Sequence, residues 1–168
     1  MSESVEPTLV VNLASRGDTR RLGYRLGSIL AAGDLVVLEG DLGAGKTFLV
    51  RAVARSLGVP TSIRITSPTF DLIHELPGRF PLIHADFYRL SDPREVEELG
   101  LADRIGGDAL TLVEWGDRFA RELGGEGLWL HISLDDAGAR SCRLQGRGPR
   151  GRALMAQARR VVGRAEQA

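Results

Sequence analysis

Apolar positions along this chain follow two spacings, and segments of the two kinds alternate. Short apolar runs and, in 128–134, a strict alternation of apolar and polar side chains are typical of strands. Apolar side chains three and four positions apart are typical of helices that cover a sheet. The strand-like segments are 8–13, 35–38, 80–85, 109–113 and 128–134. This order predicts an α/β fold with a mostly parallel central sheet flanked by helices, to which antiparallel strands are added.

Capping residues predict where the helices begin and end. Residues 15–18 (Ser-Arg-Gly-Asp) have the spacing of a capping box, so we expect a helix from there to about Gly33. A second helix follows residue 47 and ends near Gly58. Residues 92–95 (Asp-Pro-Arg-Glu) open a short acidic helix. Further helical segments are expected at 116–123 and 154–162.

The segment 128–134 should form a half-buried strand. Trp129, His131 and Ser133 occupy the face opposite its apolar residues, so we expect that face to be polar. Residues 140–144 are expected to pair with this strand as a hairpin. The pattern in 61–79 is less regular, with a turn around Pro68 and another at Gly78, and predicts no strand.

The amino-acid composition is typical of a globular protein. The 168 residues suit a single domain over 1–168, with 1–7 frayed and 147–168 forming a basic C-terminal tail or helix. The formal net charge of zero gives no reason to expect strong nucleic-acid binding. One cysteine, Cys142, excludes an internal disulfide and a Cys-based zinc cluster.

The chain carries no signal for a membrane or for export. No apolar run approaches the roughly 20 residues of a membrane span. The first basic residue is Arg16, whereas a secretory leader begins with positive charge. We therefore expect a cytoplasmic protein without a membrane partner.

The strongest motif lies between the second strand and the second helix. Residues 40–47 (Gly-Asp-Leu-Gly-Ala-Gly-Lys-Thr) match the phosphate-binding loop G-x-x-x-x-G-K-[ST], or Walker A motif, at every fixed position. Glycines let backbone N–H groups converge on phosphate oxygens, and the helix that follows adds its positive dipole end. Lys46 would then contact the β- and γ-phosphates, and Thr47 would bind Mg²⁺.

The lysine of this loop has no equivalent elsewhere in the chain. Of the 22 basic residues, Lys46 is the only lysine, which leaves 21 arginines. A planar guanidinium cannot replace a compact ammonium in a tight loop. Retention of lysine at this one position indicates a functional role.

Two acids follow predicted strands and are candidates to complete the site. Asp86 ends the strand 80–85, and Glu114 ends the strand 109–113. A phosphate loop needs an acid at a strand end to hold Mg²⁺ directly or through water, and a second acid could position the attacking water. The sequence does not decide which acid does which, and a helix-capping role is the alternative for either.

The nucleotide is expected to be ATP. Guanine recognition by an N-K-x-D or T-K-x-D motif is impossible because the chain has no second lysine.

His74 lacks a metal-ligand partner at a useful spacing, and His131 is expected to be solvated. The arginines of 147–164 are interpreted as a solvated helix face rather than as an RNA or acidic-partner site.

Four motifs in order resemble the TsaE (YjeE) family. They are the phosphate loop 40–47, Ser67-Pro68-Thr69-Phe70, the segment 84–90 (His-Ala-Asp-Phe-Tyr-Arg-Leu) and Val113-Glu114-Trp115. Each later motif is weak alone, but the ordered set is specific, and the resemblance covers about residues 9 to 144.

The resemblance implies a small P-loop ATPase of tRNA modification. Proteins of this family are needed for the threonylcarbamoyl modification of adenosine 37 in tRNA, but they do not transfer the group themselves. They act on a heterodimer of TsaD- and TsaB-type proteins, and ATP hydrolysis is thought to reset that complex. The tRNA would thus be reached indirectly.

The same resemblance assigns roles to individual residues. Thr47 and Glu114 would bind Mg²⁺, and Lys46 and Asp86 would support hydrolysis. The residues that would contact the nucleotide are Ser15, Gly40, Leu42, Gly43, Ala44, Gly45, Lys46, Thr47, Thr69, Trp115 and Arg140. Among these, Ser15 and Arg140 match only loosely, by position, and would lie on the base side. Residues 67–70 would form a switch-like loop.

Three positions depart from the family pattern. Phe48 stands where a small hydroxyl residue is usual, Phe87 replaces a common leucine, and Gly116-Asp117 follows Trp115 in place of proline or serine and glutamate. None removes a proposed ligand, but Phe48 could alter packing beneath the phosphates.

Three functions remain open from the sequence. The first is the accessory ATPase just described. The second is a small-molecule kinase, which should have an arginine-rich lid, for which residues 140–152 are the best segment. The third is a nucleotide-dependent binding module, which would need Lys46 and Thr47 but neither acid.

Overall fold

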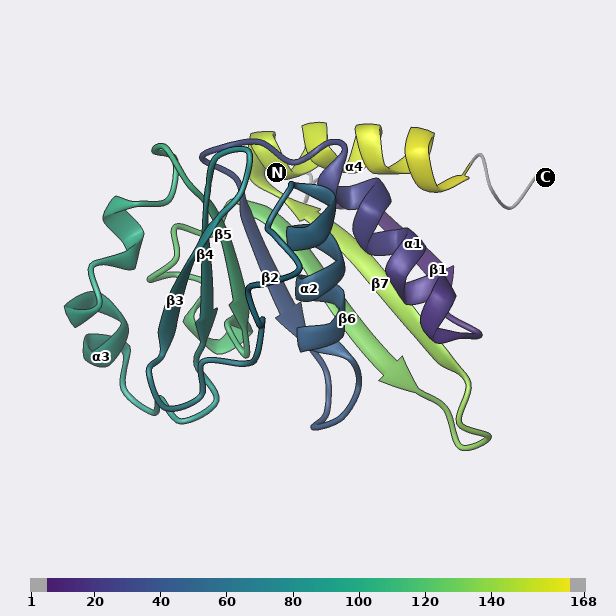
Figure 1. The fold of residues 1–168 in the computed structure, drawn as a ribbon, viewed down its shortest axis with the longest axis horizontal. Coiled ribbons are helices and arrows are strands. Elements are labelled where there is room, and N and C mark those ends of the chain that lie inside the picture. Colours follow the sequence, from purple (N-terminus) through teal and green to yellow (C-terminus); the bar gives the residue numbers. More distant parts are fainter. Residues whose placement is uncertain (1–5, 164–168) are drawn as a thin grey trace, which may run out of the picture.

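A seven-stranded mixed sheet organises the protein. The computed structural model describes residues 6–163. The strand order is β1-β7-β6-β2-β5-β4-β3, in which β6, β2, β5 and β4 are parallel to one another and β1, β7 and β3 pair antiparallel at the two ends (Figure 1). The α/β fold with a mostly parallel centre is therefore confirmed.

The strands and helices alternate along most of the chain. The strands are β1 Thr8–Asn12, β2 Leu35–Glu39, β3 Ile73–Pro77, β4 Pro81–Asp86, β5 Leu110–Glu114, β6 Gly127–Leu134 and β7 Arg140–Arg147. The helices are α1 Arg16–Gly27, α2 Lys46–Ser56, α3 Pro93–Glu98 and α4 Gly148–Val162, with short 3₁₀ turns at Leu101–Asp103 and Asp117–Phe119.

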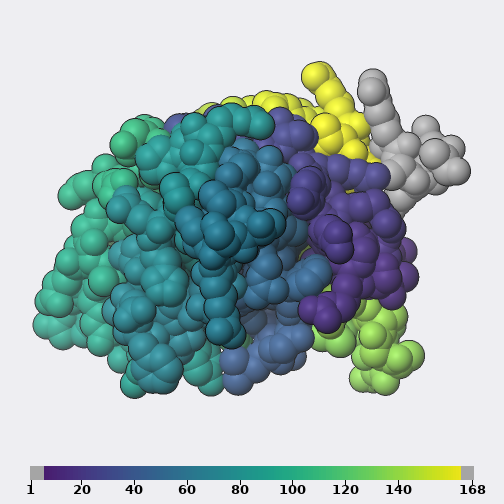
Figure 2. Space-filling model, viewed as in Figure 1, coloured from purple at the N-terminus to yellow at the C-terminus, as the bar shows by residue number. Residues whose placement is uncertain are grey.

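Each face of the sheet has its own hydrophobic core. Buried residues of α1, α2 and α4, among them Leu22, Leu49 and Leu154, pack on one face. On the other face, Phe87 and Phe119 meet edge to face and pack with residues of α3 and the two 3₁₀ turns. Figure 2 shows α1 (purple) and α2 (blue) closing over the first face beside the teal segments near β3. Within residues 6–163, no helix is both long and apolar enough to cross a lipid bilayer.

Caps set the helix starts as predicted. Ser15 accepts from the backbone N–H of Asp18, whose carboxylate accepts from the Ser15 N–H in return. Asp92 and Glu95 form the same reciprocal box at α3, with Pro93 in the first turn. Both helices therefore begin where their side chains satisfy backbone donors that lack a helical partner.

Two predicted helices are shorter in the structure. The first ends at Gly27 rather than near Gly33, because the chain must turn into β2: Gly33 N–H donates to the Ala109 carbonyl, and Asp34 accepts from Ala31 N–H. The segment 116–123 forms only a 3₁₀ turn and further turns, because Gly116 supplies no side-chain cap of the kind that begins the similarly short α3.

The edge strand and one face of β6 also differ from expectation. The strand β3 was not predicted, because it is half-exposed and ends in Pro77, which only an edge strand tolerates. Trp129, expected on a polar face, is buried beneath the Arg147 guanidinium, 4.3 Å from the ring centroid, whereas Leu134 is exposed. The hairpin with 140–144 and the C-terminal helix are confirmed. Residues 1–5 of the expected frayed segment and 164–168 of the basic tail lie outside the described residues.

Close packing of α1 on α2 yields a stability prediction. A Cβ at Gly23 would lie 2.4 Å from the Cβ of Ala52, too close without a shift of α1. We expect Gly23→Ala to lower the free energy of unfolding by about 1–3 kcal/mol in urea denaturation, as overpacking does.

Gly17→Ala is the matched control in the same helix, because a Cβ there meets nothing closer than 3.4 Å. It should be neutral or stabilise by up to about 1 kcal/mol. Equal losses of stability in both variants would contradict the packing explanation.

Candidate functional site

The loop between β2 and α2 has a backbone that only glycine adopts easily. Gly40, Gly43 and Gly45 have φ values of 144°, 80° and 112°. A Cβ at Gly40 would lie 2.4 Å from the Ile132 carbonyl oxygen, so this glycine permits close contact with β6. Gly43 and Gly45 instead face open space, with no atom within 4 Å of a Cβ built there. The loop is therefore anchored at its start and open at its tip.

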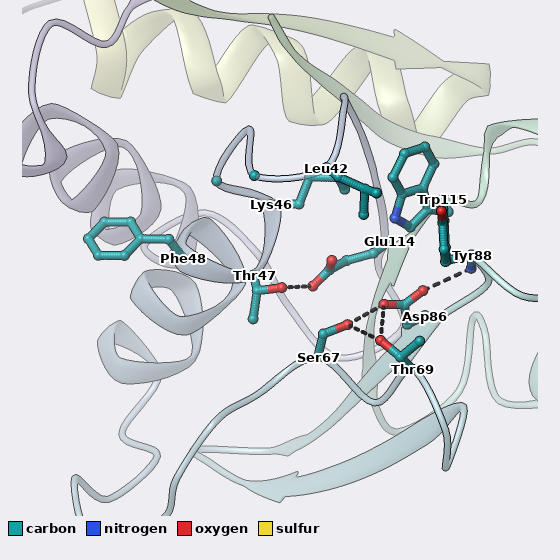
Figure 3. A pocket seen from close by; sticks show the side chains of 12 residues that line it. Leu42, Lys46, Thr47, Phe48, Ser67, Thr69, Asp86, Tyr88, Glu114 and Trp115 are labelled. Atoms are coloured by element: carbon teal, nitrogen blue, oxygen red, sulfur yellow. Dashed lines mark hydrogen bonds between the residues drawn. The ribbon is translucent and has the colours of Figure 1, made fainter.

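The start of α2 is suited to bind an anion. Gly45 stands at the N-cap and offers no side chain to the free N–H groups of the first turn. These groups and the helix dipole favour negative charge. Beside them lies a first cavity of about 340 Å³ (Figure 3). Its lining residues are Leu42, Gly43, Gly45, Lys46, Thr47, Phe48, Ser67, Thr69, Asp86, Tyr88, Glu114 and Trp115.

Lys46 is folded back onto its own loop. Its Nζ donates to the carbonyls of Gly40 and Asp41, at 2.5 and 3.0 Å, and lies 4.1 Å from the centroid of the Trp115 ring. Burial lowers the pKa of this ammonium, and the negative charges of Glu114 and Glu39 partly oppose that effect. The ammonium is thus held where a phosphate oxygen could replace the carbonyls as its partner.

Glu114 at the end of β5 joins two side chains at one oxygen. Its Oε1 accepts from Thr47 Oγ1 at 2.7 Å and lies 2.9 Å from Nε2 of His84 on β4. Glu114 is 3 % exposed and His84 is fully buried. A hydroxyl and a carboxylate are the hard oxygen ligands that Mg²⁺ prefers, so Thr47 and Glu114 together fit this ion.

Asp86 at the end of β4 is held by the segment before β3. Its Oδ2 accepts from the hydroxyls of Ser67 and Thr69, and its Oδ1 accepts from the Tyr88 N–H at 2.8 Å (Figure 3). Asp86 and Glu114 are register partners in the parallel pair β4–β5. Both acids therefore reach the cavity from the same edge of the sheet.

The mouth of the cavity is lined by apolar and aromatic side chains. Trp115 has a left-handed backbone, with φ of 60°, and its ring lies 5.0 Å from that of Tyr88. Leu42 and Tyr88, which also line the cavity, are exposed at 70 % and 45 %. This rim would face either a ligand or a protein surface placed over the site.

A second cavity of about 300 Å³ lies on the other side of Gly43 and Gly45. It is lined also by Arg16, Thr19, Phe48 and Arg140. The Arg16 guanidinium lies 4.8 Å from the centroid of the Phe48 ring. Thr19 Oγ1 and Arg140 Nε are buried and have no hydrogen-bond partner within residues 6–163. Unmet polar atoms around a hollow are suited to a polar ligand.

The structure gathers most of the sequence-predicted residues around the two cavities. Leu42, Gly43, Gly45, Lys46, Thr47, Thr69, Asp86, Glu114 and Trp115 line the first cavity, and Arg140 lines the second. Gly40 and Ala44 belong to the loop but are buried and line neither cavity. Ser15 lines neither cavity, since its side chain caps α1.

One buried residue of the site escaped the sequence reasoning. His84 was quoted only as part of the motif 84–90 and was given no role, although it precedes Asp86 by two residues on one strand and so shares its face. That spacing was the available signal. His74 lies near Asp71 and His131 is exposed, in line with their dismissal. Within the described part of the chain, no group of three or more His, Cys, Asp or Glu residues could hold a metal ion.

Known proteins match this chain over most of its length. The model of the family "Threonylcarbamoyl adenosine biosynthesis protein TsaE" matches residues 13–142. A protein of Treponema pallidum is 41% identical over 109 residues, which cover 65% of this chain and 79% of that protein. One of Streptomyces coelicolor is 45% identical over 117 residues, covering 67% and 77%. Both are named tRNA threonylcarbamoyladenosine biosynthesis protein TsaE.

A solved structure extends the match to the whole fold. The crystal structure of YdiB from Bacillus subtilis superposes with a TM-score of 0.77 at 28% sequence identity, and the match covers 94% of this chain and 98% of YdiB. The family match and the relatives agree on the family, and the solved structure shares the mixed α/β fold. The chain belongs to the TsaE family.

Proposed function

We propose that this protein is an ATPase that acts in the threonylcarbamoyl modification of adenosine 37 of tRNA. Its relatives carry the name of that pathway. The single observation that carries the ATPase proposal is the meeting of Thr47 and Glu114, 2.7 Å apart, beside Lys46 and the open start of α2. A phosphate site, a lysine and a pair of Mg²⁺ ligands are what ATP hydrolysis by a P-loop protein needs.

The loop would bind the phosphates and Lys46 would neutralise them. Gly43, Gly45, Lys46 and Thr47 line the first cavity, and the Lys46 ammonium would exchange its two carbonyl partners for phosphate oxygens. Mg²⁺, held by Thr47 and Glu114, would offset the charge that develops during phosphoryl transfer.

Asp86 is the better candidate to orient the attacking water. Both acids line the first cavity, but Glu114 is bonded to Thr47 and is the proposed metal ligand, which leaves Asp86 for the water. The hydroxyls of Ser67 and Thr69 hold Asp86 from the segment that resembles a switch loop. A change in that segment would therefore change the position of the acid.

The second cavity is suited to the sugar and base. It adjoins the loop at Gly43 and Gly45, and Thr19 and Arg140 offer it unpaired polar atoms. The Phe48 ring lines both cavities. ATP is preferred over GTP because the chain lacks the lysine-containing guanine motif.

The protein would act through TsaD- and TsaB-type partners. The exposed side chains of Leu42 and Tyr88 line the first cavity, where a partner surface would sense the nucleotide. With a formal net charge of zero, the protein has no strong electrostatic attraction for tRNA, which it would reach through those partners.

The segment 140–152, which a kinase would need as its lid, forms β7 and the start of α4. Arg140–Arg147 form β7, which pairs with both β6 and β1. Arg150 on α4 is bound to Asp34 by two hydrogen bonds of 2.6 and 2.9 Å. This segment is therefore built into the fold and is not free to close over an acceptor.

Lys46 gives the first test of nucleotide binding. We expect Lys46→Ala to weaken ATP binding about 10- to 150-fold, which corresponds to the roughly 1.5–3 kcal/mol of a hydrogen bond to a charged group. Lys46→Arg should fail as well, because its planar guanidinium does not fit the same pair of carbonyls. Titration calorimetry measures both.

Arg143→Ala is the matched control, since it also removes one positive charge but from an exposed position of β7 that lines neither cavity. ATP affinity equal to that of the unmodified protein is expected. If Lys46→Ala bound ATP as tightly as this control, the phosphate role of Lys46 would be wrong.

Hydrolysis with and without partners tests the pathway. We expect slow ATP hydrolysis by the protein alone, a marked increase with the TsaD–TsaB pair, and loss of both with Glu114→Ala, which removes a metal ligand. Phosphate release measures the rate. Rapid phosphorylation of a metabolite without any response to the pair would favour a kinase, and tight ATP binding without hydrolysis would favour a binding module.

A further inference from the structure

His84 is a buried polar side chain close to the first cavity to which the proposed mechanism gives no role. It lies on β4, is fully buried, and its Nε2 is 2.9 Å from Glu114 Oε1. An ionised carboxylate only accepts hydrogen bonds, so Nε2 is the donor and carries the ring proton. His84 therefore binds the same oxygen of Glu114 that accepts from Thr47.

A histidine at this position is costly for the fold. Within the described residues, its other ring nitrogen, Nδ1, is buried without a hydrogen-bond partner. A buried polar atom left unpaired costs about 1–3 kcal/mol. Its cross-strand neighbour on β5 is the buried apolar residue Leu112, and an apolar side chain would suit this position as well. The gain must come from the bond to Glu114.

The sheet register explains why His84 reaches Glu114. In the parallel pair of β4 and β5, Asp86 is the register partner of Glu114, and His84 is the partner of Leu112. His84 and Asp86 point to the same face because they are two residues apart. Asp86 is therefore directly beside Glu114, and His84 is diagonally adjacent to it, two residues earlier along the strand.

We propose that His84 is a positioning residue for the metal ligand Glu114, an inference that rests on the proposed Mg²⁺–nucleotide site. Its bond fixes Oε1, which would leave Oε2 free to bind the ion. If Thr47 Oγ1 bound the metal in place of Glu114 Oε1, His84 would remain as the donor that keeps the carboxylate in place. A glutamate side chain otherwise loses considerable rotamer freedom when it becomes a ligand. Groups that orient metal ligands in this way typically change metal affinity 10- to 100-fold.

The test compares two amide side chains, Gln and Asn at position 84, which differ only in length. In His84→Gln the amide nitrogen can take the place of Nε2, whereas in His84→Asn it lies near the position of Nδ1 and cannot reach Glu114. Calorimetry with a non-hydrolysable ATP analogue, in excess Mg²⁺ and in EDTA, gives two dissociation constants. Their ratio measures how much the metal tightens nucleotide binding.

We expect His84→Gln to keep the ratio of the unmodified protein and His84→Asn to reduce it about 10- to 100-fold. Affinity in EDTA should be unchanged in both, which a merely structural effect would not produce. Thr111→Val is the control, because this fully buried hydroxyl on β5 also lacks a partner within residues 6–163 and lines neither cavity. It should leave both constants unchanged.

Three results would overturn the proposal. They are an unchanged ratio in His84→Asn, equal losses in the Gln and Asn variants, and a loss in Thr111→Val as large as in His84→Asn. If the Asn variant does not fold, His84→Leu takes its place, since it supplies no donor and fills the space with apolar atoms. Failure of the unmodified protein to bind the analogue, or to bind it more tightly with Mg²⁺, would instead overturn the proposed function on which this inference rests.

Discussion

The parallel pairing of β2, β5 and β4 is the constraint on which the site depends. In this register Leu38, two residues before the phosphate loop, is opposite Glu114, and Glu114 is opposite Asp86. Parallel strands end at a common edge, so the loop and both acids meet there although they lie far apart in the sequence. A register shift of one residue in β4 would turn Asp86 and His84 to the other face. The site is thus a property of the sheet more than of any one motif.

The same edge holds four of the seven buried polar or charged residues in the described part of the chain. Lys46, His84, Asp86 and Glu114 are each no more than 5 % exposed. They are tolerable because each is bonded to a neighbour, and Glu114 and Asp86 each accept from two or more donors. These bonds hold the two acids in place without a nucleotide, whereas Lys46 would have to exchange its carbonyl partners for phosphate oxygens. Such an arrangement exchanges stability for function.

The sequence predicted the parts of the site that local spacing determines. The phosphate loop has fixed positions, and Asp86 and Glu114 were visible because acids at the ends of apolar runs are unusual enough to notice. His84 was missed because its meaning depends on the pairing of β4 with β5, which no local pattern encodes. Trp129 was misplaced for a related reason: Arg147, on the neighbouring strand, covers its ring. Local rules predicted helix starts, but helix ends depended on where the chain had to turn into the sheet.

Phe48 shows how the structure changes the interpretation of a departure from the family pattern. From the sequence we expected this ring to affect packing beneath the phosphates. Figure 3 shows it pointing away from the Thr47–Glu114 pair, and its ring faces the Arg16 guanidinium at the second cavity. An aromatic face paired with a cation is suited to stack on a planar base. The departure therefore leaves the metal side of the proposed site intact, and any consequence for affinity should arise on the side of the sugar and base.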